Sequence, residues 1–259
     1  MDISSRPVSS RCSANNFFMQ NFELISFANA DDLASRAASA WLDEIESASR
    51  SGKTHCVALS GGRITQKFFT SVVEQNKKRA VSFERVHFFW ADERCVPPTD
   101  PESNFKMASE LLFAPLKIPA NQIHRIRGED SPEAAVRIAE AELRRIAPAD
   151  KNGGPRLDLM SLGMGEDGHV ASLFPEAPPE ILNCTAPFLA VENSPKPPPK
   201  RISLSYAAIA AAKQVWVLVW GAGKETALRE SLAPSEKTPL ARVIQSRLQT
   251  KIFSDFSLG

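Results

Sequence analysis

The stretch LDLMSLGMGEDGHV, residues 157–170, contains the strongest structural signal in this sequence. Its apolar half, Leu157 to Leu162, is typical of a buried strand. The glycines that follow let the backbone turn sharply where the strand ends, and the turn presents Asp167 and His169 two residues apart. An imidazole beside a carboxylate can act as a general base near neutral pH. Because ligands bind at the carboxyl ends of strands in open α/β sheets, we expect a functional site at this turn.

Outward from this turn, strand-like and helix-like runs alternate along the chain. The alternation predicts an α/β fold in a single domain, with a mostly parallel, Rossmann-like sheet and helices on both faces. Strands are expected at residues 22–27, 54–59, 85–91, 157–162, 201–205, 214–220 and 251–253, and helices at about 31–49, 65–76, 103–112 and 132–146, after Gly223 and after Pro239.

Composition narrows the class of protein. The chain has 259 residues, of which 43% are hydrophobic and 24% charged, enough for a sizeable core. The net charge of +1 creates no global field, and no apolar stretch reaches transmembrane length, so we expect neither a nucleic-acid nor a membrane partner. The four cysteines are scattered without a CxxC pair, which favours reduced thiols and a cytoplasmic location.

The first 18 residues differ from the rest of the chain. They are rich in serine, polar and without a helical period. Asp2 and the lack of an amphipathic pattern argue against a transit peptide. We therefore expect residues 1–18 to form a disordered extension, and the domain to comprise residues 19–259, beginning near Met19.

Two further strand ends carry residues suited to a binding site. Ser60-Gly61-Gly62-Arg63 follows the strand at 54–59, and backbone amides exposed before a helix can cradle a phosphate. A Gly-Gly turn is more often structural, however, and this one lacks the Walker pattern. Asp92-Glu93-Arg94 follows the strand at 85–91. A solvated charge cluster is the simpler interpretation, but its place directly after FFWA favours the lining of a pocket.

His169 is the candidate base among four histidines. His55, His87 and His124 lie in or beside predicted strands, so we interpret them as structural. The sequence has no HExxH motif and no Cys/His cluster, and one His with one Asp makes a poor zinc site. We expect neither a metal ion nor a cofactor.

The proline-rich segment SPKPPPK, residues 194–200, is typical of a stiff polyproline spacer. The same stiffness could hold the cations of Lys196, Lys200 and the adjacent Arg201 over a site.

Together these motifs resemble those of the 6-phosphogluconolactonase family. The resemblance covers about residues 20 to 255 and implies a fold of the glucosamine-6-phosphate deaminase and ribose-5-phosphate isomerase type. In the family the Gly-Gly loop commonly continues with Ser or Arg, then Thr-Pro, whereas Ile64 follows Arg63 here, so a hydroxyl is missing. The resemblance rests on Gly61–Arg63, WADERCVP at 90–97, Ser103–Phe105, the highly specific GMGEDGHVASLFP at 163–175, and PPPKRISL at 197–204.

The resemblance implies hydrolysis of 6-phospho-D-glucono-1,5-lactone to 6-phosphogluconate, the second step of the oxidative pentose phosphate pathway. In this scheme His169 activates a water molecule, and Asp167 orients the imidazole, without metal or cofactor. The partner is then a small sugar-phosphate lactone, and the protein is expected to be a monomer or a weak homodimer. The residues implied in substrate binding are Gly61, Gly62, Arg63, Asp92, Arg94, Asn104, Lys196, Lys200 and Arg201.

Two alternatives remain open. The first is a deaminase or isomerase acting on glucosamine 6-phosphate. Deaminases carry Asp-Glu-Tyr at positions 92–94 and an Ala-Phe-Asn-Glu-Pro-like run at 171–175, so both differences favour the lactonase. The second is a non-catalytic sugar-phosphate sensor. Such regulators need a DNA-binding segment, and the first 18 residues are too short and irregular for a helix-turn-helix.

Overall fold

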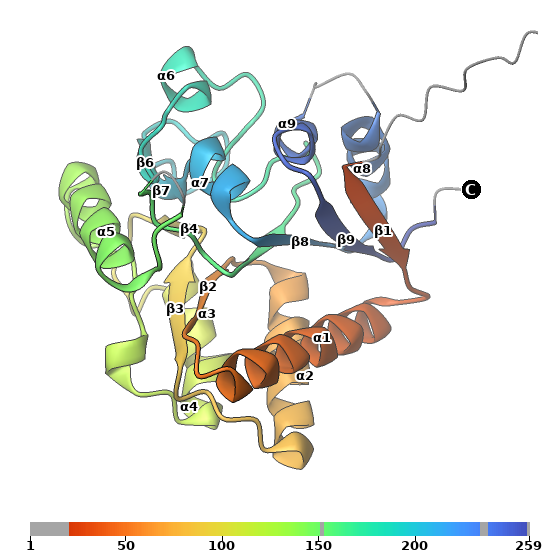
Figure 1. The fold of residues 1–259 in the computed structure, drawn as a ribbon. Coiled ribbons are helices and arrows are strands. Elements are labelled where there is room, and N and C mark those ends of the chain that lie inside the picture. Colours follow the sequence, from red (N-terminus) through yellow and green to blue (C-terminus); the bar gives the residue numbers. More distant parts are fainter. Residues whose placement is uncertain (1–20, 151–152, 234–237, 258–259) are drawn as a thin grey trace, which may run out of the picture.

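A six-stranded sheet forms the centre of the computed structural model, which describes residues 21–150, 153–233 and 238–257 (Figure 1). The expected extension, residues 1–18, and the proposed domain start at Met19 lie outside the described residues. Every strand pair in this sheet is parallel, as predicted. The strand order is β1 (Phe22–Ser26), β9 (Thr250–Ser254), β8 (Gln214–Val219), β5 (Leu159–Gly163), β2 (His55–Leu59) and β3 (Val86–Trp90).

Helices cover both faces of the sheet, which confirms the predicted layering. In Figure 1, α1 (Ala30–Arg50) and α2 (Arg63–Arg79) lie together on one side, and α8 (Glu225–Leu232) and α9 (Pro239–Gln245) lie on the other. No helix in the described ranges is long and apolar enough to cross a membrane. The remaining helical elements are α3 (Asn104–Ala108), the π-helical turn η1 (Ser109–Phe113), α4 (Ala114–Leu116), the 3-10 turns η2 (Ala120–Gln122) and η3 (Ala222–Lys224), α5 (Pro132–Ile146), α6 (Pro179–Leu182) and α7 (Tyr206–Ala211).

Buried aromatic rings join α1 and α2 to the sheet. Trp41 on α1 lies 5.5 Å from Phe68 on α2 and 6.3 Å from Phe88 on β3, measured between ring centroids. All three side chains are fully buried, and each such burial contributes roughly 1.5–3 kcal/mol. All five residues of β2 are buried as well, because a central parallel strand has helices on both sides.

A second, small antiparallel sheet was not predicted. Its strand order is β4 (Asp92–Arg94), β7 (Arg201–Leu204) and β6 (Phe188–Val191). The sequence predicts only a strand end at residues 92–94 and no strand at 188–191. A three-residue strand of charged side chains has no periodicity to reveal it, and its partner is distant in the sequence. The pairing sets Arg94 opposite Arg201 in register.

The order of the parallel sheet reverses between β2 and β5. After β2 the chain adds β3 on one side, and after β5 it adds β8 and β9 on the other. Loops that leave the carboxyl ends of such strands diverge and create a crevice. The loops at this point are 60–62 after β2 and 164–169 after β5. Both are among the three strand ends at which the sequence predicts a binding site.

Candidate active site

A cavity of about 270 Å³ opens at this crevice. Segments from several strand ends and from the small sheet contribute to its walls. Most of the predicted site residues meet there. The lining residues are Ser60, Gly61, Gly62, Arg63, Ile64, Asp92, Arg94, Asn104, Gly163, Met164, Gly165, His169, Ala171, Arg201 and Lys224.

Asp167 and His169 form a close pair beside the cavity. Oδ1 of Asp167 lies 2.5 Å from Nδ1 of His169 and also accepts the backbone N–H of His169 at 3.3 Å. A carboxylate at Nδ1 favours the tautomer that carries its proton there, which leaves Nε2 as the proton acceptor. The ring of Phe174 lies 4.7 Å from the imidazole, centroid to centroid. Both neighbours hold the ring in place.

The neighbours of Asp167 stabilise its negatively charged form. Burial alone would raise its pKa, but the hydrogen bond and charge of His169, with the charge of Lys196, lower that pKa well below its usual value. Nζ of Lys196 lies 3.7 Å from Oδ1 of Asp167 and 3.5 Å from Nδ1 of His169. Lys196 therefore lies next to the pair, and is absent from the cavity lining given above.

Gly165 gives the pair its space. Its N–H donates to the carbonyl of His169 at 2.9 Å, which closes the turn. A Cβ at position 165 would overlap the imidazole of His169 and the carboxylate of Asp167. At Gly163, in contrast, a Cβ would meet only the carbonyl of Gly61 at 3.7 Å, an ordinary contact. Of these two glycines, only Gly165 is required by the pair.

Asn104 ties the Gly-Gly loop to the small sheet. A Cβ at Gly61 would overlap the Asn104 amide, so the loop and this side chain are in close contact. Nδ2 of Asn104 donates to the carbonyl of Asp92 at 2.9 Å. The Asp92 carboxylate in turn accepts the hydroxyl of Ser172 at 2.7 Å. Three separate segments are thereby fixed around one cavity.

Glu93 has a structural role that was not predicted from the sequence. Its buried carboxylate accepts the backbone N–H groups of Arg94, Asn104 and Phe105, each at 2.8 Å, and the hydroxyl of Ser103 at 3.0 Å. Burial raises the pKa of Glu93, and these four hydrogen bonds oppose the rise. Glu93 thus fixes the start of α3 beside the cavity, rather than lying in solvent.

The two arginines of the small sheet are held by carbonyl groups. Arg201 is buried, and its Nε and Nη2 donate to the carbonyls of residues 196–198 at 3.0–3.1 Å. Burial lowers its pKa. Nη1 of Arg94 donates to the carbonyl of Glu102 at 2.5 Å, while its buried Nε has no partner among the described residues. Both guanidinium groups keep donors available at the cavity.

Arg63 and Lys224 add positive charge to the cavity. Neither forms an ion pair within the described part of the chain, and the Arg63 guanidinium lies 5.5 Å from the Trp220 ring. Burial, and next the charge of Arg63, lower the pKa of Lys224. Lys224 is not among the site residues predicted from the sequence. It follows the strand 214–219 across Gly221-Ala222-Gly223, so the strand-end argument applied elsewhere could have found it.

Lys200 is a predicted site residue that the structure does not bring to the cavity. Its Nζ lies 3.7 Å from Glu192, and its side chain is 58% exposed. Lys200 directly precedes Arg201 at the start of β7. Successive side chains of a strand point to opposite faces, so the two cations diverge.

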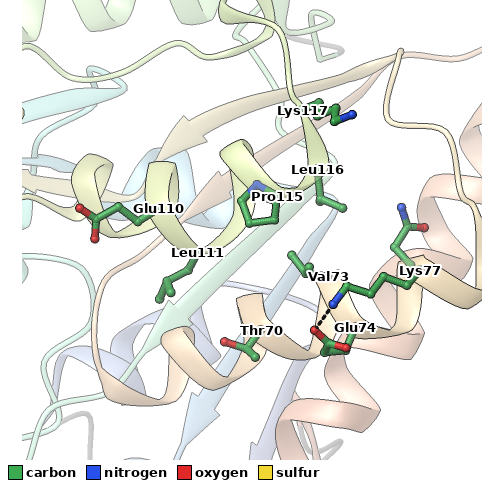
Figure 2. Close-up of a pocket in the computed structure, with 10 residues that line it drawn as sticks. Thr70, Val73, Glu74, Lys77, Glu110, Leu111, Pro115, Leu116 and Lys117 are labelled. Carbon is green, nitrogen blue, oxygen red and sulfur yellow. Dashed lines mark hydrogen bonds and ion pairs between the residues drawn. The ribbon is translucent and has the colours of Figure 1, made fainter.

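A larger cavity, of about 480 Å³, lies elsewhere, between α2 and the segment from η1 to α4 (Figure 2). Leu111, Pro115 and Leu116 make much of its wall apolar, and Glu74 and Lys77 pair with each other at 2.5 Å. Its polar groups do not converge on one point. The smaller cavity, at the crevice between β2 and β5, is therefore the better candidate for an active site.

Comparison with known proteins identifies the class. A family model described as glucosamine-6-phosphate isomerases/6-phosphogluconolactonase matches residues 28–252, and the chain belongs to this family.

Several similar relatives carry the name 6-phosphogluconolactonase. The probable 6-phosphogluconolactonase 3, chloroplastic, of Oryza sativa subsp. indica is 37% identical over 70% of this chain, and the match spans only 57% of that protein. The 6-phosphogluconolactonase of Haemophilus influenzae is 38% identical over 71% of this chain and 76% of that protein. The solved structure of 6-phosphogluconolactonase from Trypanosoma brucei superposes with a TM-score of 0.77 at 25% identity, covering 89% of this chain and 95% of that one.

Proposed function

We propose that this chain hydrolyses 6-phospho-D-glucono-1,5-lactone to 6-phosphogluconate. The observation that carries the proposal is the 2.5 Å contact between Asp167 and His169 at a cavity lined by four cations. The similarity to 6-phosphogluconolactonases supports the same choice. A lactone carbonyl is already electrophilic, so a base and an anion pocket suffice without a covalent nucleophile.

In this mechanism Nε2 of His169 removes a proton from water as the water oxygen bonds to C1 of the lactone. The carbonyl electron pair moves onto its oxygen to give a tetrahedral oxyanion. When that pair returns, the bond from C1 to the ring oxygen breaks, and the imidazolium returns its proton to the ring oxygen. Asp167 keeps Nδ1 protonated and stabilises the imidazolium. General-base catalysis of this kind supplies about 10²–10⁴-fold in rate.

The phosphate binds at the amino end of α2. Gly62 caps this helix without a side-chain hydrogen bond, so the first amides of α2 are available. Arg63 and Lys224 form no ion pair within the described residues, and a phosphate would relieve their mutual repulsion. Amides at a helix start together with two cations form a recognised anion site.

Arg94 and Arg201 serve the same anionic substrate from the small sheet. The amides of Gly165 and Gly168 already donate to carbonyls within the turn, at 2.9 and 3.1 Å. Guanidinium donors are therefore the better source of oxyanion stabilisation. Asn104 and Asp92 remain for the sugar hydroxyls, because Asp92 can accept more hydrogen bonds than the one from Ser172.

An assay of lactone hydrolysis with the full chain tests the proposal. The protein should accelerate hydrolysis beyond the spontaneous rate, and His169→Ala should remove most of that acceleration. Lys200→Ala, outside the cavity, is the matched control and should keep it. Release of ammonia from glucosamine 6-phosphate without lactone hydrolysis would instead establish the deaminase alternative.

The cellular setting is a further part of the proposal: a cytoplasmic enzyme that is a monomer or a weak homodimer. Cys56, Cys95 and Cys184, the cysteines within the described residues, are free thiols, which suits a reducing compartment. Cell fractionation tests the location, and light scattering across a concentration series tests the assembly state.

A further inference from the structure

A second polar cavity lies at the opposite edge of the parallel sheet. It has a volume of about 380 Å³ and is bounded by the amino ends of β8 and β9, the end of α7 and the turn after α9. In a parallel sheet all amino ends share one edge, so this basal cavity is separated from the candidate active site by the length of the strands. The mechanism proposed above uses none of its residues.

The basal cavity is positively charged. Arg156, Lys213, Arg247 and Lys251 line it, and no acidic side chain does so among the described residues. Lys213 is neutralised, because its Nζ pairs with the carboxylate of Asp158. Three cations remain.

Arg156 and Lys251 have no side-chain partner. Within the described ranges neither makes a side-chain hydrogen bond or ion pair. Glu23 stands opposite Lys251 in the register of β1 and β9, yet the two form no ion pair within 4.0 Å. Both cations are therefore available to a ligand.

Arg247 is the buried member of the group, with 9% of its surface exposed. Its Nη1 and Nη2 donate to the carbonyls of Ile209, Ala210 and Lys213 at 2.6, 2.9 and 3.3 Å. These carbonyls carry no net charge, and the buried Nε has no partner among the described residues. A buried cation without a counter-ion is costly, so a bound anion would stabilise this arrangement.

The cavity also has room for an organic group. A volume of about 380 Å³ falls within the roughly 300–1,000 Å³ typical of small-molecule sites. Leu248, another lining residue, is 92% exposed and offers an apolar contact at the rim. Charge and size together describe a ligand with an anionic head and an organic body.

We propose that the basal cavity binds an organic phosphate, the chemical class to which nucleotides belong, independently of the active site. The phosphate lies between Arg156 and Lys251 above the Arg247 guanidinium. The organic group lies against Leu248.

Calorimetric titration of the full chain with ADP, pyrophosphate and adenosine tests this proposal. ADP should bind, pyrophosphate should bind more weakly, and adenosine should not bind. Binding of adenosine as tight as that of ADP would refute the charge argument. Equal binding of pyrophosphate and ADP would refute the organic contact, and absence of ADP binding would refute the site.

Two double variants locate the binding. Arg156→Gln/Lys251→Gln should weaken ADP binding by at least about tenfold, since hydrogen bonds to charged groups are worth about 1.5–3 kcal/mol each. Both side chains are unbonded, so the fold and the lactone hydrolysis should be unaffected. The matched control, Arg63→Gln/Lys224→Gln, removes two cations from the other cavity and should leave ADP binding within twofold. The reverse pattern would assign ADP to the active site and overturn the inference.

Discussion

Ser172 donates a 2.7 Å hydrogen bond to Asp92, joining the segment after β5 to the first strand of the small sheet. Both side chains are buried, and 80 positions separate them in the sequence. Asp92 also holds Asn104 through its backbone carbonyl. This hydrogen bond therefore connects the segment after His169 to Asp92 and Asn104, which we propose bind the sugar hydroxyls.

Ser172→Ala should destabilise the folded protein and lower the rate of lactone hydrolysis. Leaving the buried Asp92 carboxylate without this donor should cost about 1–3 kcal/mol in the free energy of unfolding. Denaturant titration measures that loss. Ser246→Ala is the control, because its hydroxyl bonds only to the carbonyl of Val243 in its own turn, and it should change stability by less than about 0.5 kcal/mol. Equal effects of both variants would contradict the connection.

Asp167→Asn should lower kcat at least about 100-fold while KM changes little. The amide cannot stabilise the imidazolium, and that stabilisation is realised only in the transition state. Initial rates over a range of lactone concentrations separate the two constants. If KM rises and kcat does not change, Asp167 binds a substrate hydroxyl instead.

Lys224→Ala and Arg63→Ala should reduce the preference for a phosphorylated lactone. The substrate phosphate carries about 1.5–2 negative charges at neutral pH, whereas unphosphorylated gluconolactone carries none. The measurement is the ratio of kcat/KM for the two lactones. Lys200→Ala should leave that ratio unchanged. Equal losses on both substrates would make these cations catalytic or structural rather than phosphate ligands.

Gly165→Ala should abolish activity, since the added Cβ would displace the imidazole or the carboxylate. Gly163→Ala, two residues earlier at the end of β5, should remain folded and keep most of its activity. Circular dichroism establishes the fold of each variant before rates are compared. An active Gly165→Ala variant would show that the pair does not need this space.

Stability should fall when the pH is lowered through the range of histidine titration. Burial lowers the pKa of His87 and of His124, whose rings share a 2.9 Å contact between Nδ1 and Nε2. The folded state therefore resists protonation of both rings. Their contribution is fully present above the unfolded pKa of about 6.5 and is lost as the pH falls through the lower folded values.

Thermal melts between pH 8 and pH 5 measure this effect. His124→Gln should flatten the dependence of the melting temperature on pH. A variant with the same slope as the parent would assign the acid sensitivity to other groups.

Much of the cavity lining was predictable because its residues follow strands. The turn at 163–169 and the loop at 60–63 lie at the carboxyl ends of apolar runs, and the parallel sheet brings such ends together. Local sequence was sufficient for those segments.

The small sheet and the accessory residues depend on distant partners. Residues 92–94 become a strand only because 201–204 pair with them. The carboxylate of Glu93 is buried because α3 begins against it, a contact that no local pattern shows. Lys196 and Lys200 looked equivalent in the proline-rich segment, and only the folded chain separates them.

The cavity at the crevice is lined by residues that span the chain from Ser60 to Lys224 and come from both sides of the crevice. No short fragment of the chain can carry it. Contacts between such distant segments form late and are lost together when a domain unfolds cooperatively. The proposed lactone hydrolysis should therefore fall in proportion to the fraction of unfolded molecules, which makes it a sensitive readout for any variant whose defect lies in folding rather than in chemistry.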